Sequence, residues 1–306
     1  MGRKGSSAGP TGLVVVNKEP GWTSHDVVAK LRGVFGQRRT GHAGTLDPSA
    51  TGVLLVGMGR ATRLMRFLQD TTKRYDGTLV LGSTTTTLDA DGEVTATFDM
   101  GQVDDASIKT QASLLTGEIL QVPPMVSALK VDGVRLHELA RQGVEIERAA
   151  RPVTIESFTV TPTEDPMVFG FSVVCSSGTY VRSLVDDLGR GLGGGAHLGS
   201  LRRTAVGAFS LEDARTLDEI MAVTDRETAA TSEALLTPAA AMRHLPSLVV
   251  DDEGAARVAT GRSLEATSIL ADGATPVAVL DAEGALLAIY EPKAGALAAS
   301  VVLAAG

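Results

Sequence analysis

The chain has 306 residues, of which 43% are hydrophobic, and a net charge of −8, which suits an ordinary globular protein of one or two domains and excludes a disordered or fibrous chain. Its single cysteine, Cys175, excludes an intrachain disulfide and a cysteine metal cluster. The chain shows neither an apolar run of 18 residues nor a signal peptide. We therefore expect a cytoplasmic protein that does not enter a membrane.

The charge is distributed unevenly along the chain. Residues 1–75 carry 12 lysines and arginines against four acidic residues, whereas the rest carries 16 against 32. A basic cluster often serves only solubility, but a local basic field also attracts a phosphate backbone. The net charge therefore does not exclude a nucleic acid as partner.

The N-terminal region predicts a tail, a strand and a helix. Residues 1–12 are rich in glycine and serine, and we expect them to be disordered. The valine-rich run Leu13–Val16 predicts a strand. Apolar residues at helical spacing predict a helix over Asp26–Phe35, and Thr23 or Ser24 can cap it.

The most informative stretch is Gly41–Leu54. Its three glycines within twelve residues and its Asp47-Pro48 pair predict an irregular loop, in which Pro48 keeps Asp47 out of a helix. The apolar run Val53–Met58 predicts a buried element behind the loop. An Asp-Pro pair alone is usually a structural turn, yet a carboxylate on a stiff loop, with His42 nearby, also suits a nucleophile or base.

Further elements follow in order. The pattern predicts a basic amphipathic helix over Gly59–Leu68 and a strand over Lys73–Gly82 in which Tyr75 packs against its neighbours. Helices are expected around Ala106–Leu115 and Gly133–Gln142, strands over Pro152–Thr161 and Met167–Cys175, and a helix over Leu184–Leu192. After an acidic, Ala/Thr-rich stretch, short β-like runs at Ser247–Val250, Pro276–Leu280 and Leu286–Tyr290 predict a small β domain.

Several ordered motifs resemble one family. Gly-His-Ala-Gly-Thr-Leu-Asp-Pro at 41–48, continued by Ala-Thr-Gly-Val-Leu at 50–54, resembles the catalytic motif of the TruB family of tRNA pseudouridine synthases. The resemblance spans residues 13 to about 210. It also rests on the motif at 18–24, Lys73-Arg74-Tyr75, Gly178-Thr179-Tyr180-Val181-Arg182 and the segment 196–204. Thr86 stands where the family usually has an aspartate.

The resemblance implies a fold and a domain layout. The fold is α+β, the pseudouridine-synthase fold, with a mixed, mostly antiparallel sheet, flanking helices and a small C-terminal β-rich domain. A catalytic domain would cover residues 13–240, with an RNA-gripping insertion at about 104–150, and a PUA-like RNA-binding domain residues 241–306. Within the insertion and beside it, candidate phosphate contacts are Lys130, Arg135, Arg141, Arg148 and Arg151. We expect a monomer.

The resemblance also implies a reaction. A uridine in the T-loop of tRNA, at position 55, would be isomerised to pseudouridine, so that ribose C1′ is joined to uracil C5 instead of N1. The partner would be the T-arm of tRNA, and no cofactor or metal is required. Asp47 would be the essential carboxylate and nucleophile. Whether it attacks the ribose or the base, or abstracts a sugar proton, stays open at this point.

The other implied site residues surround the base. Arg182 would keep Asp47 ionised, and Tyr75 would stack on the uracil and take part in proton transfer. The base must leave the folded RNA, and His42 would fill the vacated stack. The remaining implied substrate-binding residues are Tyr180, Leu201, Asp89 and Lys18.

Three alternatives stay open. The first is a non-catalytic RNA-binding or RNA-folding protein. The second is a hydrolase that uses Asp47 and Asp89 as a carboxylate pair, which needs a raised pKa on one partner. The third is a guide-RNA-dependent relative in the same superfamily, although the long insertion favours a stand-alone enzyme.

Overall fold

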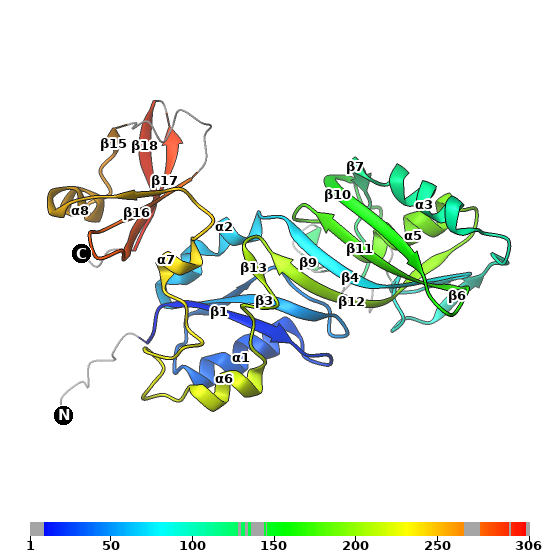
Figure 1. Cartoon of the computed structure of the whole chain (residues 1–306), viewed down its shortest axis with the longest axis horizontal. Helices are drawn as coiled ribbons and strands as arrows, with labels where there is room; N and C mark the ends of the chain where they lie inside the picture. Colours follow the sequence, from blue (N-terminus) through cyan, green and yellow to red (C-terminus); the bar gives the residue numbers. More distant parts are fainter. Residues whose placement is uncertain are drawn as a thin grey trace. The chain divides into compact units, whose positions relative to one another are not determined.

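A computed structural model describes residues 9–127, 130–131, 134–135, 144, 146–265, 276–293 and 295–303. The chain divides into two compact units (Figure 1). The first unit comprises Met1–Pro48, Gly52–Gln69 and Val206–Gly306, and the second comprises Ser49–Thr51 and Asp70–Ala205. Residues 1–8 of the predicted tail lie outside the described residues.

The N-terminal part of the first unit is built on three antiparallel strands. Strand β1 (Gly12–Lys18) pairs with β3 (Thr51–Met58) along its whole length, and β2 (Thr40–Ala43) also pairs with β3. The expectation of an irregular loop throughout Gly41–Leu54 is therefore wrong at both ends. Gly41 and Gly52 lie within paired strands, and Gly52 has a φ of +98°, a conformation that favours glycine. The irregular part is Gly44–Ala50.

The predicted first helix and first strand are confirmed. Helix α1 (Ser24–Val34) begins after Thr23, whose hydroxyl accepts from the Asp26 N–H, while Asp26 accepts from the Thr23 N–H. This reciprocal capping box satisfies two backbone donors at the helix start. The predicted buried element after the loop is β3, where every residue from Gly52 to Met58 is buried.

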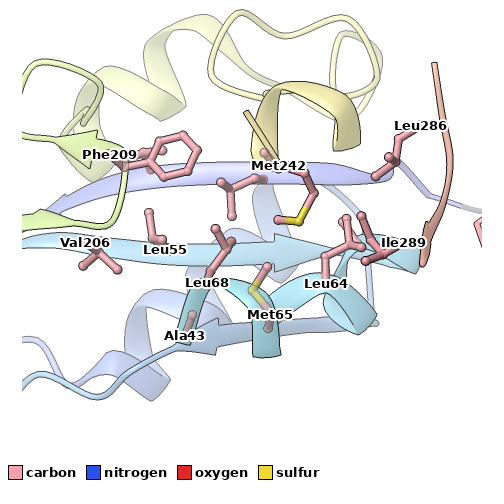
Figure 2. Packing of buried hydrophobic residues seen from close by; sticks show 14 of the residues in the cluster. Ala43, Leu55, Leu64, Met65, Leu68, Val206, Phe209, Met242, Leu286 and Ile289 are labelled. Atoms are coloured by element: carbon pink, nitrogen blue, oxygen red, sulfur yellow. The ribbon is translucent and has the colours of Figure 1, made fainter. Parts of the chain in front are cut away.

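The predicted basic helix is present in two pieces, the 3₁₀ helix η1 (Gly59–Leu64) and α2 (Met65–Gln69). Its apolar face packs against the C-terminal sheet: Leu64 lies beside Ile289, in a buried cluster that also contains Leu286 (Figure 2). Its basic face meets the same sheet: Arg60 donates to the Leu303 carbonyl at 2.6 Å and Arg63 to the Val302 carbonyl at 2.7 Å. Both faces thus hold the C-terminal domain within the first unit.

The rest of the first unit consists of short helices and a second sheet. It contains β13 (Phe209–Ser210), α6 (Leu217–Val223) and α7 (Pro238–Ala241), followed by a five-stranded sheet of order β14-β16-β17-β18-β15. The strands of that sheet are β14 (Ser247–Val249), β15 (Leu264–Glu265), β16 (Val277–Leu280), β17 (Leu286–Lys293) and β18 (Ala296–Val302). The three predicted β runs are confirmed, whereas α8 (Asp252–Ala259) and β18 were not predicted. β14 pairs with β16 in parallel, and the other pairs of this sheet are antiparallel.

The second unit carries strands in the order β12-β4-β11-β10-β7. These are β4 (Lys73–Leu81), β7 (Gly117–Gln121), β10 (Arg151–Pro162), β11 (Val168–Cys175) and β12 (Ala196–Val206). β11 pairs with β4 and with β10, and β10 also pairs with β7; all three pairs are antiparallel. The predicted β4, β10 and β11 are confirmed. On the buried face, Phe158 and Phe171 meet edge to face with ring centroids 6.0 Å apart.

Helices and hairpins complete the second unit. α3 (Asp105–Leu114) and α5 (Val181–Gly191) confirm two predicted helices, and β5 (Ser83–Thr85) pairs with β6 (Val94–Thr97). The helix predicted from Gly133 is wrong at its start, because β9 (Val134–Arg135) pairs with β8 (Lys130–Val131). Valines favour strands over helices, which accounts for this difference. The rest of that predicted helix, 136–142, lies outside the described residues.

The predicted fold class is confirmed: the protein is α+β, with a mixed central sheet and a small C-terminal sheet domain. In the described part of the chain, no helix is long and apolar enough to cross a membrane. The same residues contain no group of three His, Cys, Asp or Glu side chains placed to hold a metal ion.

Candidate active site

Asp47 lies on the irregular segment Gly44–Ala50, which connects β2 to β3, and Asp47 itself belongs to the first unit. The segment is bounded by Gly44 at φ +85° and Gly52 at φ +98°, a backbone conformation that favours glycine. Pro48 follows Asp47 and disfavours a helical backbone there. The Asp47 side chain is half-buried, so its carboxylate is held partly out of water but is accessible to a ligand.

The residue after Asp47 is fixed by a buried lysine. Lys18 is 1% exposed, and its Nζ donates to the carbonyls of Glu19 at 3.0 Å, Trp22 at 2.7 Å and Pro48 at 3.0 Å. The Pro48 carbonyl also accepts from the Gly21 N–H at 2.9 Å. Charge-assisted hydrogen bonds of this kind are stronger than neutral ones. Lys18, expected to bind substrate, thus positions the loop through the protein backbone.

The residue before Asp47 is fixed as well. The Leu46 N–H donates to Ser24 Oγ at 2.9 Å, and Ser24 Oγ lies 3.2 Å from the Leu46 carbonyl. Ser24 is buried in the first turn of α1. The segment 18–24 therefore packs against the Asp47 loop and holds the residues on both sides of Asp47.

His42 lies on β2, five residues before Asp47, and is half-buried. Its ring meets the His25 ring edge to face, with centroids 5.4 Å apart and planes at 82°. His25 is exposed on α1, and no sequence motif had pointed to it. The contact restricts how the His42 ring can turn.

Arg182 is the central cation of the second unit. It lies in the first turn of α5, is 5% exposed, and donates from its two terminal nitrogens to the carbonyls of Thr87 and Val126, at 2.8 Å each. It also forms an ion pair of 3.5 Å with Asp89. A planar guanidinium can make such divergent contacts, which an ammonium group cannot reproduce.

Asp89 is 9% exposed and both of its carboxylate oxygens are engaged. One oxygen accepts from the Thr87 hydroxyl and from the Asp91 N–H at 3.2 Å, and the other faces Arg182. The Asp89 carbonyl accepts from Thr85 at 2.7 Å. These contacts fit a carboxylate that shapes the turn after β5, and they give no support to a hydrolytic pair with Asp47.

Tyr180 precedes α5 and its backbone is fixed by Gln121 at the end of β7. The Tyr180 N–H donates to the Gln121 side-chain oxygen at 2.7 Å, and the Gln121 amide donates back to the Tyr180 carbonyl at 3.1 Å. Gln121 is 2% exposed. A single glutamine at a strand end carries no sequence signal, so this positioning residue was missed.

Tyr75 lies on β4, 7% exposed, on the same face as Lys73. Burial, followed by the charge of Arg203, lowers the pKa of Lys73 to about 8. Leu201 lies on β12, half-buried, and its carbonyl faces the Thr51 hydroxyl at 3.5 Å. Tyr75 is thus a buried ring next to a destabilised cation.

The site residues form two groups, one in each unit. Lys18, His42 and Asp47 belong to the first; Tyr75, Asp89, Tyr180, Arg182 and Leu201 belong to the second. In the first group the structure brings Lys18 together with the Asp47 loop. In the second it brings Arg182 together with Asp89. After Asp47 and Pro48 the chain enters Ser49–Thr51, which belong to the second unit.

Comparison with known proteins identifies the class. Residues 32–181 match the N-terminal domain of the TruB family pseudouridylate synthases, and residues 182–244 match the tRNA pseudouridylate synthase B C-terminal domain. Pseudouridine synthases are isomerases. The chain belongs to the TruB family and is a pseudouridine synthase.

Relatives and solved structures agree with this assignment. The chain is 47% identical to tRNA pseudouridine synthase B of Streptomyces coelicolor, over 94% of this chain and 95% of that protein. It is also 47% identical to the protein of that name from Rhodococcus jostii, over 95% and 93%. A Cbf5-Nop10-Gar1 complex contains a chain with a TM-score of 0.70 and 26% identity, over 95% of this chain and 83% of that one. An H/ACA RNP bound to a substrate RNA containing 2′-deoxyuridine contains one with a TM-score of 0.71 and 24% identity, over 96% and 85%, which supports the fold alone.

Proposed function

We propose that this enzyme isomerises the uridine at position 55, in the T-loop of tRNA, to pseudouridine. Relatives at 47% identity are named tRNA pseudouridine synthase B, whereas the chain in the Cbf5-Nop10-Gar1 complex is 26% identical. This difference favours tRNA over a guided RNA substrate and a stand-alone monomer over a guide-RNA particle. The basic charge of residues 1–75 suits a phosphate backbone.

The pinning of the Asp47 loop is the observation that carries the proposal. Hydrogen bonds to Leu46 and Pro48 fix the backbone on both sides of one half-buried carboxylate. A reacting group gains rate when it is held in place before the substrate arrives. Asp47 is therefore the nucleophilic carboxylate of the reaction. Bond exchange at C1′ is balanced within the nucleoside: the bond to N1 breaks, the bond to C5 forms, and the C5 proton moves to N1 through solvent.

Arg182 and Tyr75 complete the catalytic set. Arg182 is a permanently charged group whose position is fixed by two backbone carbonyls, and the family resemblance assigns it the role of keeping Asp47 ionised. Tyr75 is a buried aromatic ring that offers a stacking surface to uracil and a hydroxyl for proton transfer.

Substrate binding requires the base to leave the RNA stack, which costs about a few kcal/mol in lost stacking. His42 takes the vacated place in the stack, and its contact with His25 sets the ring orientation. Tyr180 and Leu201 line the base pocket, while Asp89 and Lys18 shape the loops around it. The C-terminal sheet domain, which the family resemblance marks as PUA-like, also binds the RNA.

Mapping the product tests the proposal. Unmodified tRNA is incubated with the wild-type enzyme, with Asp47→Asn, or with Asp252→Asn as a control carboxylate that is exposed on α8. Pseudouridine is then located by carbodiimide modification and primer extension. We expect modification at position 55 by the wild type and by Asp252→Asn only. Modification at another position would refute the T-loop assignment, and unchanged modification by Asp47→Asn would refute the nucleophile.

A further inference from the structure

A buried lysine lies on the same strand and the same face of the sheet as the candidate stacking tyrosine. Lys73 and Tyr75 are two residues apart on β4, whereas Arg74 and Asp76 between and after them are exposed. Side chains at this spacing on a strand point to one face, about 7 Å apart. Lys73 is 6% exposed and Tyr75 is 7% exposed. The lysine therefore lies beside the tyrosine on the buried face of β4.

The neighbouring strands hold both residues in place. On β11, Cys175 pairs with Lys73 and Val173 pairs with Tyr75. On its other side β4 lies next to β12. The Nζ of Lys73 donates to the Thr71 carbonyl at 2.9 Å. The ammonium group is therefore positioned by the interior of the sheet and not by a surface loop.

A second buried cation lies on β12. Arg203 is 1% exposed and is two residues from Leu201, which is placed in the proposed base pocket, so the two share one face of β12. The charge of Arg203 acts on Lys73: burial, followed by this charge, lowers the pKa of Lys73 to about 8. Two like charges this close in the interior of a protein disfavour each other. Groups that a fold keeps in so unfavourable an environment are concentrated at functional sites.

The other ionisable groups around Lys73 do not offset this effect. Cys175 on β11 and Asp70, which precedes β4, favour the ammonium form, but less strongly than burial and Arg203 disfavour it. Glu156 on β10 acts on Cys175 and accepts from the Thr72 hydroxyl at 2.9 Å. Lys73 is therefore charged at neutral pH and loses its charge a little above it.

The proposed reaction develops negative charge on the base. When the bond between ribose C1′ and uracil N1 breaks, its electron pair stays on the uracil, which becomes an anion with charge spread over N1, O2 and O4. The ring is neutral again once C5 has bonded to C1′, and the C5 proton then moves to N1. A cation held in place before the reaction stabilises such an anion more strongly in a protein interior than in water.

We propose that Lys73 supplies a buried positive charge behind Tyr75 that stabilises the uracil anion while the bond to the ribose is broken. The inference rests on the proposed function, in which uracil stacks on Tyr75. Lys73 acts through space across the tyrosine and does not touch the substrate, so it is a positioning residue and not a catalytic one. Its charge should raise kcat and leave RNA affinity unchanged, because the anion forms only after binding.

Single-turnover formation of pseudouridine, with enzyme in excess over unmodified tRNA, tests this role. The wild type is compared with Lys73→Met, with Lys73→Arg, and with Lys30→Met as a control at an exposed position of α1. At pH 7 we expect Lys73→Met to be slower by about tenfold or more, with an unchanged Kd for tRNA. Lys73→Arg should restore most of the rate, and Lys30→Met should react as fast as the wild type.

The pH dependence separates an effect of charge from a loss of structure. The wild type loses the Lys73 proton as the pH rises through about 8, so its rate relative to Lys73→Met should decrease between pH 6.5 and pH 9. Lys73→Arg keeps its charge, so its rate relative to Lys73→Met should stay constant over that range. Dividing by the rate of Lys73→Met at each pH removes the effect of any ionisation of the RNA itself.

The outcomes are distinct. Equal rates of the wild type and Lys73→Met at pH 7, or a ratio of these rates that is the same at every pH, would overturn the proposal. So would a weaker affinity of Lys73→Met for tRNA with an unchanged rate. If Lys73→Arg does not fold, the ratio of the wild type to Lys73→Met decides alone. Absence of pseudouridine with the wild-type enzyme would instead refute the proposed function.

Discussion

The two halves of the candidate site are each built around one buried cation that donates to backbone carbonyls, but they differ in how far along the chain those carbonyls lie. Lys18 reaches carbonyls that lie 1, 4 and 30 residues away. Arg182 reaches carbonyls 56 and 95 residues away. The first half is therefore a local motif, and the second exists only in the folded unit. Loss of Arg182 should accordingly damage the fold more than loss of Lys18.

Replacement of Arg182 is the largest expected effect. Arg182→Met leaves the Thr87 and Val126 carbonyls without their donor and leaves Asp89 as a buried charge without its cation. Removing one partner of a buried ion pair costs about 3–5 kcal/mol. Urea unfolding of the full chain measures this loss. The control is Arg202→Met, an exposed arginine on β12, which should change stability by about 0.5 kcal/mol or less. Equal stability of the two variants would contradict the central role of Arg182 in the second unit.

Replacement of Lys18 should cost less stability and relatively more activity. Lys18→Met removes three charge-assisted hydrogen bonds, and we expect a loss of about 2–3 kcal/mol. Because the Pro48 carbonyl is released, kcat should fall even at temperatures where the variant is fully folded. Lys30→Met, at an exposed position of α1, serves as the matched control. A stability loss as large as that of Arg182→Met would remove the distinction between the two halves.

Ser24 isolates the loop from the rest of the fold. Ser24→Ala removes the contacts with both backbone groups of Leu46 and should cost about 1–2 kcal/mol. We expect kcat to fall while the Kd for RNA is nearly unchanged, since the loop holds a reacting group and not the RNA. Ser113→Ala, exposed on α3, controls for loss of a hydroxyl. A fall in RNA affinity with unchanged kcat would assign the loop to binding.

Lys73 gives the most specific effect, a change of stability that depends on pH. Its folded pKa of about 8 lies below the usual 10.5, so between these pH values the unfolded chain holds a proton that the folded chain has lost. The contribution of Lys73 to the free energy of unfolding therefore increases as the pH rises through that window. Relative to the wild type, Lys73→Met should be more stable at pH 7.5 than at pH 10, by about 1–3 kcal/mol. If the difference in stability between Lys73→Met and the wild type does not change with pH, burial does not lower the pKa of Lys73.

The same contrast explains what the sequence could predict. The strand at Leu13–Val16 and the capped helix after Thr23 depend on neighbouring residues, and the structure confirms them. Gln121 and the two carbonyls that receive Arg182 leave no local pattern, because their function depends on pairing between distant segments. The predicted helix from Gly133 fails for a related reason, since the valines on either side of it pair as short strands.

The second unit also shows where a family resemblance stops. The motif around Tyr180 and Arg182 predicts which residues lie near the base, but not what holds them. Asp186 lies on the same helix, only four residues after Arg182. The cavity of about 320 Å³ that it lines is formed only where the segments after β5 and β7 pack against α5. A sequence pattern thus identifies residues on one helix face, whereas the cavity beside them is formed by segments that are distant in the sequence and meet only in the folded chain.

The most direct test of the account is the single-turnover release of tritium from tRNA labelled at uracil C5, with enzyme in excess, for the wild type and for Asp47→Asn. RNA binding is measured with the same preparations. We predict release of one tritium per target uridine by the wild type, and binding of similar strength without release by Asp47→Asn. Release at the wild-type rate by Asp47→Asn would contradict the claim that the pinned Asp47 carboxylate carries out the reaction.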